Sequence, residues 1–450
     1  MRSTARSTTR SITSRVIMPT VPGHRRASDA TAARLGRATL AYLAVMMGII
    51  TLAPFQFAAR PVHGLSPLWD WADIVMNVVM FLPFGFVYQL TRPAGSPAPL
   101  WRVWGLGALL SACVETAQLF EATRYSSLVD IATNSSGALL GSAICSFIVA
   151  RIESENAVRT MALELPLMAL IYLLVPLAWL IGLVGAGTMR AWLVLPIAVF
   201  AGGILGTVHG AYLAPSRGIA RLWLLLGALL WFTVALLPAT LRDGSLLIAA
   251  ASLTVGTAWL RSIATARFRA VYVNQRFELP TLRLVLPLFA AYLALSSLWP
   301  LDDASFIWRG SIALVPSGAV LNNRLIYAML EHIAAFTLVG YVIAEFHGRD
   351  RQHFREIAPR VIGWGGGVSL LLEATRGWHP DYGASLLMLV FTIAASTFGG
   401  WLYLLQRDHV KALVARRNRP KVKSNRPATL MPSAPIATYE YAFPLDRRRA

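Results

Sequence analysis

Long runs of apolar residues recur from residue 38 to residue 406, each close to the length of about 20 residues that a helix needs to cross a bilayer. Inside a bilayer only helices and closed barrels satisfy their backbone hydrogen bonds, and these runs are too long and too uniformly apolar for barrel strands. The sequence therefore predicts an all-α polytopic membrane protein. We expect about twelve transmembrane helices, approximately over residues 38–58, 71–91, 100–120, 128–150, 162–186, 190–213, 221–240, 244–262, 281–299, 325–346, 359–376 and 384–406.

The distribution of charge agrees with this interpretation and predicts an orientation. Charged residues make up 14% of the chain, whereas a typical soluble domain has about a quarter. If the N-terminus is cytoplasmic, most of the 41 Lys and Arg residues fall on the inner side and every inner segment is basic, as the positive-inside rule requires. We therefore predict an integral, multi-pass protein of the plasma (inner) membrane with both termini in the cytoplasm, and we attribute the net charge of +19 mainly to topology.

The two basic ends are predicted to be disordered cytoplasmic segments, over residues 1–37 and 407–450. The composition of the first segment also fits a transit peptide, but the charge pattern of the remaining chain favours a cytoplasmic arm. Neither end contains a recognised nucleic-acid recognition module, so we do not expect nucleic acid as a partner. The chain contains no metal-binding, phosphate-loop or serine-hydrolase motif, so we expect no cofactor and no metal. The oligomeric state is not predicted.

An internal repeat divides the apolar part of the chain. The stretch "GLGALLSACVETAQ", which begins at Gly105, has a later counterpart "GWGGGVSLLLEATR", which begins at Gly363. A constant offset of 258 residues aligns their Gly, Ser and Glu residues, and an offset of 255 aligns the preceding helices. We expect two four-helix units in the same, parallel orientation, over residues 38–152 and 281–406, flanking a central four-helix membrane segment over residues 153–280.

The two units are not chemically equal, because the polar residues of the first are mostly replaced in the second. At the same offsets Asp130 aligns with Met388 and Asn134 aligns with Thr392. We interpret the first unit as functional and the second as a degenerate structural or regulatory remnant.

The polar residues of the first unit are predicted to converge at its outer end. Helix 71–91 should begin there, helix 100–120 should end there, and helix 128–150 should begin there again. Spacings of three or four residues place the polar side chains of each helix on one face. The predicted ligand-binding set is Asp73, Asn77, Glu115, Gln118, Arg124, Asp130 and Asn134.

Each member of this set also has an ordinary structural explanation, as a helix-capping acid, a loop residue or an interhelical contact. Glu115 is the hardest to explain in this way, because an ionisable residue inside a membrane helix is functional by default. If Glu115 is ionised it needs a partner, and Arg124 is the nearest cation in the sequence.

These residues also carry a resemblance to the VanZ-like family. The stretches "DIVMNVVMFLPFG", from Asp73, and "SACVETAQLF", from Ser111, resemble its signature. That signature has Asp, Asn and Phe-Xaa-Pro-Xaa-Gly on the second helix, Glu and Gln on the third, then Arg, Asp, Asn and a Gly-rich start to the fourth. The matching residues are Asp73, Asn77, Phe81, Pro83, Gly85, Glu115, Gln118, Arg124, Asp130, Asn134, Gly137 and Gly141. The resemblance is close over residues 38–150 and weak over residues 281–406.

The resemblance implies a membrane protein of the cell envelope. The family is named for a member linked to low-level resistance to the glycopeptide teicoplanin, and its biochemical activity is generally unassigned. It therefore implies an envelope context but no particular reaction. The eight additional helices depart from the minimal unit of the family, which leaves a resistance role for this chain in doubt.

Three functions fit these observations. The leading hypothesis is an outer pocket that binds an anionic or polyhydroxyl head group of a membrane lipid, a lipid-linked cell-wall precursor or a surface glycan lipid, with Arg124 donating to phosphate or carboxylate. The first alternative is a membrane enzyme acting on such a lipid, with Glu115 or Asp130 as the catalytic base. The second alternative is a secondary transporter, although the polar set lies at one face and not at the midplane.

Overall fold

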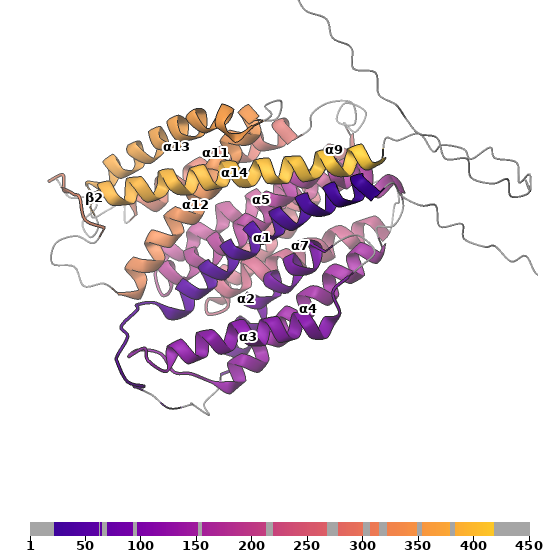
Figure 1. The fold of residues 1–450 in the computed structure, drawn as a ribbon. Helices are drawn as coiled ribbons and strands as arrows, with labels where there is room; N and C mark the ends of the chain where they lie inside the picture. Colours follow the sequence, from indigo (N-terminus) through magenta and orange to yellow (C-terminus); the bar gives the residue numbers. More distant parts are fainter. Residues whose placement is uncertain are drawn as a thin grey trace, which may run out of the picture.

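The computed structural model describes residues 22–62, 64, 70–92, 97–151, 155–212, 219–267, 278–299, 307–314, 322–348, 353–378 and 383–417. These residues form a bundle of helices that run roughly along one direction (Figure 1). The strands in this part of the chain are two short segments, β1 (Gly310–Ser311) and β2 (Ala384–Ser385), which pair in parallel. The prediction of an all-α fold is confirmed.

Three consecutive parts of the chain are named here by their helices. The first unit comprises α1 (Pro22–Leu52), α2 (Trp71–Leu90), α3 (Leu100–Gln118) and α4 (Leu128–Arg151). The central segment comprises α5 (Glu155–Gly185), the 3-10 helix η1 (Met189–Leu193), α6 (Val194–Tyr212), α7 (Ile219–Ala235), the short α8 (Leu237–Thr240) and α9 (Gly244–Arg267). The C-terminal segment comprises α11 (Glu278–Leu298), α12 (Asn323–Gly348), α13 (Phe354–Arg376) and α14 (Leu386–Arg417).

Eight helices among the described residues are long and apolar enough to cross a membrane. These spans are Ala30–Leu52, Trp71–Leu90, Leu128–Phe147, Met189–Ala211, Gly244–Arg267, Pro280–Leu298, Asn323–Gly348 and Leu386–Lys411. Helices α3 and α13 fall below this criterion, since α3 carries charged and amide side chains and α13 carries charged side chains in its first and last turns. Helices α5 and α7 contribute only shorter apolar stretches. The fold is thus that of a multi-pass membrane protein, although the predicted number of twelve spans is not confirmed.

Both basic ends contain more helix than their composition predicted. Helix α1 begins at Pro22 and α14 continues to Arg417, so the parts of the predicted disordered segments nearest the membrane are helical. Tertiary contacts explain part of this difference. The guanidinium of Arg407 donates to the backbone oxygen of Gly348 at the end of α12, with an N–O distance of 2.7 Å. Residues 1–21 and 418–450 lie outside the described residues.

Glycine residues set the closest helix contacts of the first unit, in which α2 and α4 form the most extensive pair. A Cβ atom added at Gly85 of α2 would lie less than 3.0 Å from the backbone oxygen of Ala138, a separation that real Cβ atoms essentially never show. Gly141 of α4 approaches the backbone oxygen of Leu82 equally closely. Such small residues let helix backbones touch, which is a main source of helix association in lipid.

Helices α12 and α14 of the C-terminal segment make the same kind of contact. A Cβ atom added at Gly340 would meet the backbone oxygen of Ser396, and one added at Gly399 would meet that of Thr337, again at less than 3.0 Å. Offsets of 255 for the first helix of the pair and 258 for the second align these four residues with the four that make the corresponding contacts in the first unit.

Many fully buried apolar side chains lie on α5 of the central segment. Leu174, Leu177 and Leu180 of α5 are fully buried. Helix α5 packs on α12, and 83% of the apolar window of α12 is buried inside the protein. Protein therefore surrounds α12 on most sides, whereas α2 and α9 keep most of their surface free to face lipid.

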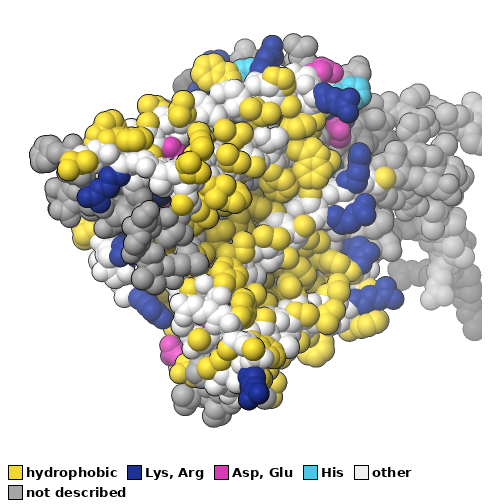
Figure 2. Space-filling model, turned by 60° about the vertical axis from the view of Figure 1, so that its left-hand side comes forward, with side chains coloured by type: hydrophobic (Ala, Val, Ile, Leu, Met, Phe, Trp, Pro, Cys, Tyr) yellow, Lys and Arg dark blue, Asp and Glu magenta, His cyan; other side chains and the backbone are white. Residues whose placement is uncertain are grey.

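Both termini of the described chain lie at one end of the bundle, the right-hand end in Figure 1. Thr31 of α1 and His409 of α14 form a hydrogen bond at this end, with an O–N distance of 3.3 Å. We call it the terminal end and the opposite one the distal end. Figure 2 shows a largely apolar face that is hollowed near its centre, with a column of Lys and Arg along the right-hand margin and others at the left and at the bottom. An excess of cations on one side of an apolar band is what the positive-inside rule predicts.

A cysteine-accessibility experiment tests the predicted orientation. Tyr125, in the loop between α3 and α4, is 65% exposed, and Lys411 of α14 is exposed at the terminal end. In a variant without Cys113 and Cys145, we expect Tyr125→Cys to react with a membrane-impermeant maleimide in intact cells. Lys411→Cys should react only after the membrane is permeabilised. The reverse pattern would show that the distal end is cytoplasmic.

Candidate functional site

Four of the predicted site residues meet at the distal end, where α2 begins, α3 ends and α4 begins. Asn77 forms a hydrogen bond with Asp130, and Asp73 lies near enough to Asp130 for their charges to interact. Asp130 also interacts electrostatically with Glu115. We call Asp73, Asn77, Glu115 and Asp130 the distal cluster. The helical spacing is the reason that they converge, because each polar side chain lies within the first or last two turns of its helix.

The acidic residues of the distal cluster are graded in depth. Asp73 is exposed, Asp130 is half-buried, and Glu115 is only 4% exposed. A polar path thus leads from the surface at the start of α2 to a carboxylate packed between α3 and α4. The outermost carboxylate of the cluster is therefore in contact with solvent, whereas the innermost one is shielded from it.

Glu115 is held by the start of α4. Its Oε2 atom accepts a hydrogen bond from the backbone N–H of Ser127, at an N–O distance of 2.7 Å, and the side chain of Ser126 also hydrogen bonds to it. The N-terminus of a helix carries partial positive charge and unpaired N–H groups, so it stabilises a carboxylate. Glu115 therefore has a partner that the sequence analysis did not consider.

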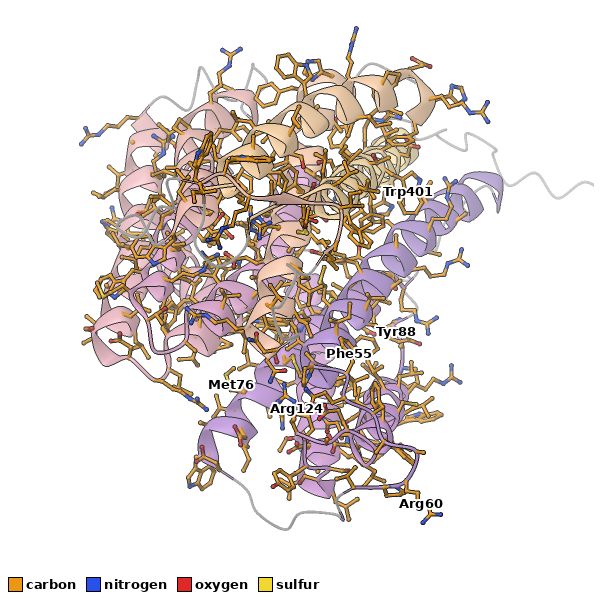
Figure 3. All side chains as sticks on the ribbon, turned by 90° about the vertical axis from the view of Figure 1, so that its left-hand side faces the viewer. Phe55, Arg60, Met76, Tyr88, Arg124 and Trp401 are labelled. Atoms are coloured by element: carbon orange, nitrogen blue, oxygen red, sulfur yellow. The ribbon has the colours of Figure 1, made fainter. Side chains whose placement is uncertain are left out.

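Arg124 does not pair with Glu115, and that prediction is wrong. Its Nε donates to the backbone oxygen of Ala53 at 3.2 Å, and its Nη2 donates to the hydroxyl oxygen of Tyr327 at 2.7 Å. The Tyr327 hydroxyl itself donates to the backbone oxygen of Ile50 at 3.1 Å. The last carbonyl groups of a helix lack intrahelical partners and favour a cation, so Arg124 caps the end of α1 and links it to α12. In Figure 3 Arg124 lies at the end of α1, near Phe55.

Two buried amides of the predicted set have unused acceptor atoms. The Nδ2 of Asn134 donates to the hydroxyl oxygen of Ser111 at 2.9 Å, and the Nε2 of Gln118 donates to the backbone oxygen of Thr51 at 3.0 Å. Among the residues that the structure describes, no hydrogen-bond partner reaches Oδ1 of Asn134 or Oε1 of Gln118. A buried acceptor without a partner costs about 1–3 kcal/mol, so both oxygen atoms favour a donor from a ligand or from water.

Glu121, which the sequence analysis did not single out, shapes the loop beside this region. It is fully buried, and its carboxylate accepts from the backbone N–H of Gln56 at 3.1 Å and from that of Thr123 at 2.7 Å. These bonds fasten the α3–α4 loop to the segment after α1. The contact with Thr123 is local and could be anticipated from a Glu followed two residues later by Thr. Nothing in the sequence predicts the contact between Glu121 and Gln56.

A second buried charged group, also missed, joins the central and C-terminal segments. Arg190 of η1 pairs with Glu331 of α12 at an N–O distance of 2.9 Å, and Glu331 is fully buried. The Tyr292 hydroxyl of α11 donates to the other carboxylate oxygen at 2.7 Å, and Arg190 donates to the backbone oxygen of Ser296 at 3.1 Å. A Glu in the middle of the apolar stretch of α12 was the available signal.

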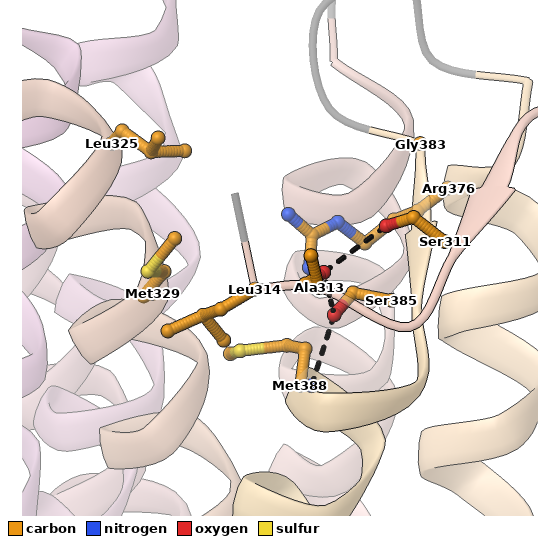
Figure 4. Close-up of a pocket in the computed structure, with 9 residues that line it drawn as sticks. All are labelled: Ser311, Ala313, Leu314, Leu325, Met329, Arg376, Gly383, Ser385 and Met388. Carbon is orange, nitrogen blue, oxygen red and sulfur yellow. Dashed lines mark hydrogen bonds between the residues drawn. The ribbon is translucent and has the colours of Figure 1, made fainter. Parts of the chain in front are cut away.

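The corresponding region of the C-terminal segment keeps the counterpart of Glu115, which is Glu373, but has Met388 in place of Asp130. Glu373 accepts from the backbone N–H of Ser385 at 3.0 Å and pairs with Arg376 at 2.8 Å. The hydroxyls of Ser369 and Thr392 are hydrogen bonded to each other. The cavity beside Arg376, Ser385 and Met388 (Figure 4) measures only about 10 Å³, which is room for no more than one water molecule.

Within the described ranges, no group of three or more His, Cys, Asp and Glu side chains is placed to hold a metal ion. The distal cluster resembles a hydrogen-bonding site more closely than a metal centre, since its charged members contact an amide and a helix N-terminus.

Comparison with known families identifies the first unit alone. Residues 26–152 match the family model described as VanZ/LLP1. This range contains α1 without its first turn, all of α2 and α3, α4, and every residue of the predicted ligand-binding set. No match was found among curated proteins or among solved structures. Together with the apolar helices, the family match indicates a multi-pass membrane protein in which residues 26–152 are similar to the VanZ/LLP1 family.

Proposed function

We propose that the distal cluster binds the head group of a membrane lipid or of a lipid-linked cell-wall precursor at the outer face of the plasma membrane. The observation that carries the proposal is the pair of buried acceptor atoms on Asn134 and Gln118. They lie on the helices that form the cluster, about one turn from Asp130 and Glu115. A head group that supplies hydrogen-bond donors would satisfy them and would reach them past the more exposed Asp73.

The contacts favour recognition through acceptors over recognition of phosphate by Arg124. The distal cluster supplies three carboxylates and an amide, while the guanidinium of Arg124 is engaged by backbone oxygens at the end of α1. Ligands with hydroxyl or amine groups complement such a set, because carboxylates accept hydrogen bonds and do not donate them when ionised. Glycan and amine head groups therefore fit better than a bare phosphate.

We further propose that α11 to α14 are a second copy of the first unit that has lost this binding role. The matched glycine contacts of α2–α4 and α12–α14 support the common origin, as do the equivalent bonds of Glu115 and Glu373 to the start of the following helix. The loss of binding is supported by the replacement of Asp130 by Met388 and by the small size of the remaining cavity.

The enzyme alternative rests on the interaction between Asp130 and Glu115. Two carboxylates in one partly buried site are the usual apparatus for general acid–base chemistry. The two functions differ in a measurable way, because an enzyme would convert an added lipid into a product, whereas a binding protein would return it unchanged.

Thermal stability in detergent tests the binding proposal. Phosphatidylethanolamine and phosphatidylglycerol have donor groups in their head groups and phosphatidylcholine has none, so we expect the first two to raise the melting temperature more. Asn134→Leu removes the acceptor at similar volume and should weaken this effect by about tenfold in lipid concentration, as expected for one lost hydrogen bond to a charged or well-aligned group. Glu115→Gln should also weaken it, with little change in the lipid-free melting temperature.

Two control variants separate binding from folding. Ser136 is exposed on α4 and bonds only to its own helix, so Ser136→Ala should leave lipid selectivity unchanged. Arg124→Gln should lower the lipid-free melting temperature and leave selectivity intact, because it removes the cap of α1. Equal stabilisation of the wild-type protein by all three lipids would refute recognition through head-group donors.

A further inference from the structure

A cavity of about 180 Å³ lies near the terminal end, far from the distal cluster along the helices. Its walls come from all three parts of the chain: α1 and α2, α5, and α12 and α14. Leu35, Leu173 and Leu402 line it, as does Leu90, which is 41% exposed. The exposure of Leu90 places one side of the cavity at the surface that faces lipid.

The lining is apolar along most of its length and polar at one end. Gln406 and His409 of α14 contribute the polar side chains nearest the terminal end, and His409 is hydrogen bonded to Thr31. An apolar wall cannot supply the two to four polar partners that a buried water needs, and an apolar cavity of about 150 Å³ is known to take up a hydrocarbon instead. A cavity with an apolar body and a polar rim complements an amphiphilic molecule.

Three exposed cations are next in sequence to residues that line the cavity. Arg34 and Arg37 are exposed on α1 beside the lining residues Leu35 and Gly36, and Arg92 follows the lining residue Thr91. Clusters of Lys and Arg at a membrane surface attract anionic lipids, with roughly 1 kcal/mol for each cation near the surface. A negatively charged head group at this level complements the rim, whereas a zwitterionic one complements it less.

We propose that this cavity, which is open to lipid at Leu90, holds part of one acyl chain of an anionic phospholipid whose phosphate lies among Arg34, Arg37 and Arg92. The lipid belongs to the leaflet at the terminal end and contacts the first unit, α5 and α14 at once. It therefore binds the three parts of the chain together at a place where they do not fill the space between them. This site is separate from the distal cluster and does not depend on the function proposed for it.

Native mass spectrometry of the full-length protein in mild detergent tests the proposal. After extensive washing and addition of phosphatidylglycerol or phosphatidylcholine, we expect one tightly bound phosphatidylglycerol per protein. Ala169 is on the α5 wall, and Ala169→Trp fills the cavity. We expect at least a tenfold loss of the bound lipid in this variant. Val45→Trp, at a 57% exposed position of α1 that does not line the cavity, is the matched control and should retain the lipid.

The double variant Arg34→Gln with Arg37→Gln tests the head-group part of the proposal. It leaves the cavity itself unchanged, unlike Ala169→Trp. Both side chains are exposed, so the protein should fold normally. It should lose the preference for phosphatidylglycerol over phosphatidylcholine. A folded Ala169→Trp protein that keeps the lipid as well as the wild-type protein would overturn the proposal. If Ala169→Trp does not fold, an unchanged lipid preference in the double variant would overturn it.

Discussion

Replacing Gly85 with alanine should remove nearly all folded protein from the membrane. The added Cβ would overlap the backbone oxygen of Ala138. A backbone atom cannot rotate away as a side chain can, so α2 and α4 would have to separate along their contact. Overpacking of this kind costs about 1–3 kcal/mol and occasionally more. We expect the upper end of that range or beyond, because Gly141 sits in the same contact and would lose its packing as well.

Gly105→Ala is the matched control for this substitution. Gly105 lies on α3 of the same unit, and no atom lies within 4 Å of a Cβ added there. Alanine is a better helix former than glycine by about 1 kcal/mol, so the abundance of this variant should equal or exceed that of the wild-type protein. Membrane abundance of a fluorescent fusion and melting temperature in detergent are the measurements. Normal abundance of Gly85→Ala would mean that α2 and α4 do not touch through their backbones.

The positions of most helices could be predicted from the sequence because a bilayer leaves few alternatives. Helix α2 was predicted over residues 71–91 and spans Trp71–Leu90, since an apolar run must be helical to satisfy its own backbone in lipid. The meeting of Asp73, Asn77 and Asp130 followed from helical spacing together with the short connections between the helices. The helix positions and the meeting of these polar residues both depend on local periodicity, which can be read from the order of apolar and polar residues.

The partners of the charged residues could not be predicted in this way. Arg124 was assigned to Glu115 by proximity in the sequence, yet it contacts the end of α1 and Tyr327, which is 203 residues later. Periodicity shows which face of a helix is polar, but the loop conformation decides which groups that face meets. The helical start of α1 was missed for the same reason, because the contact of Thr31 with His409 joins opposite ends of the chain.

The buried pair of Arg190 and Glu331 should give the second large effect. Glu331→Gln keeps the shape of the side chain and removes the charge that faces Arg190, which is only 5% exposed. Removing one member of a buried ion pair typically costs about 3–5 kcal/mol. We therefore expect a strong fall in melting temperature and in membrane abundance. The control is Glu356→Gln, which removes an exposed partner of His353 and should change stability by less than about 1 kcal/mol.

A double-variant cycle then decides whether this pair only stabilises the fold or is also required for the response to lipid. Arg190→Met combined with Glu331→Leu replaces the pair by apolar side chains of similar size, a change that is often neutral or stabilising in buried sites. Recovery of abundance, with a coupling energy of about 2 kcal/mol or more, is expected of an ion pair that joins η1 to α12. If the double variant also restores the lipid-dependent stabilisation of the distal cluster, the role of the pair is structural. A double variant that is abundant and stable but is no longer stabilised by lipid would show that the group of Glu331 and its hydroxyl partner Tyr292 is required for lipid binding.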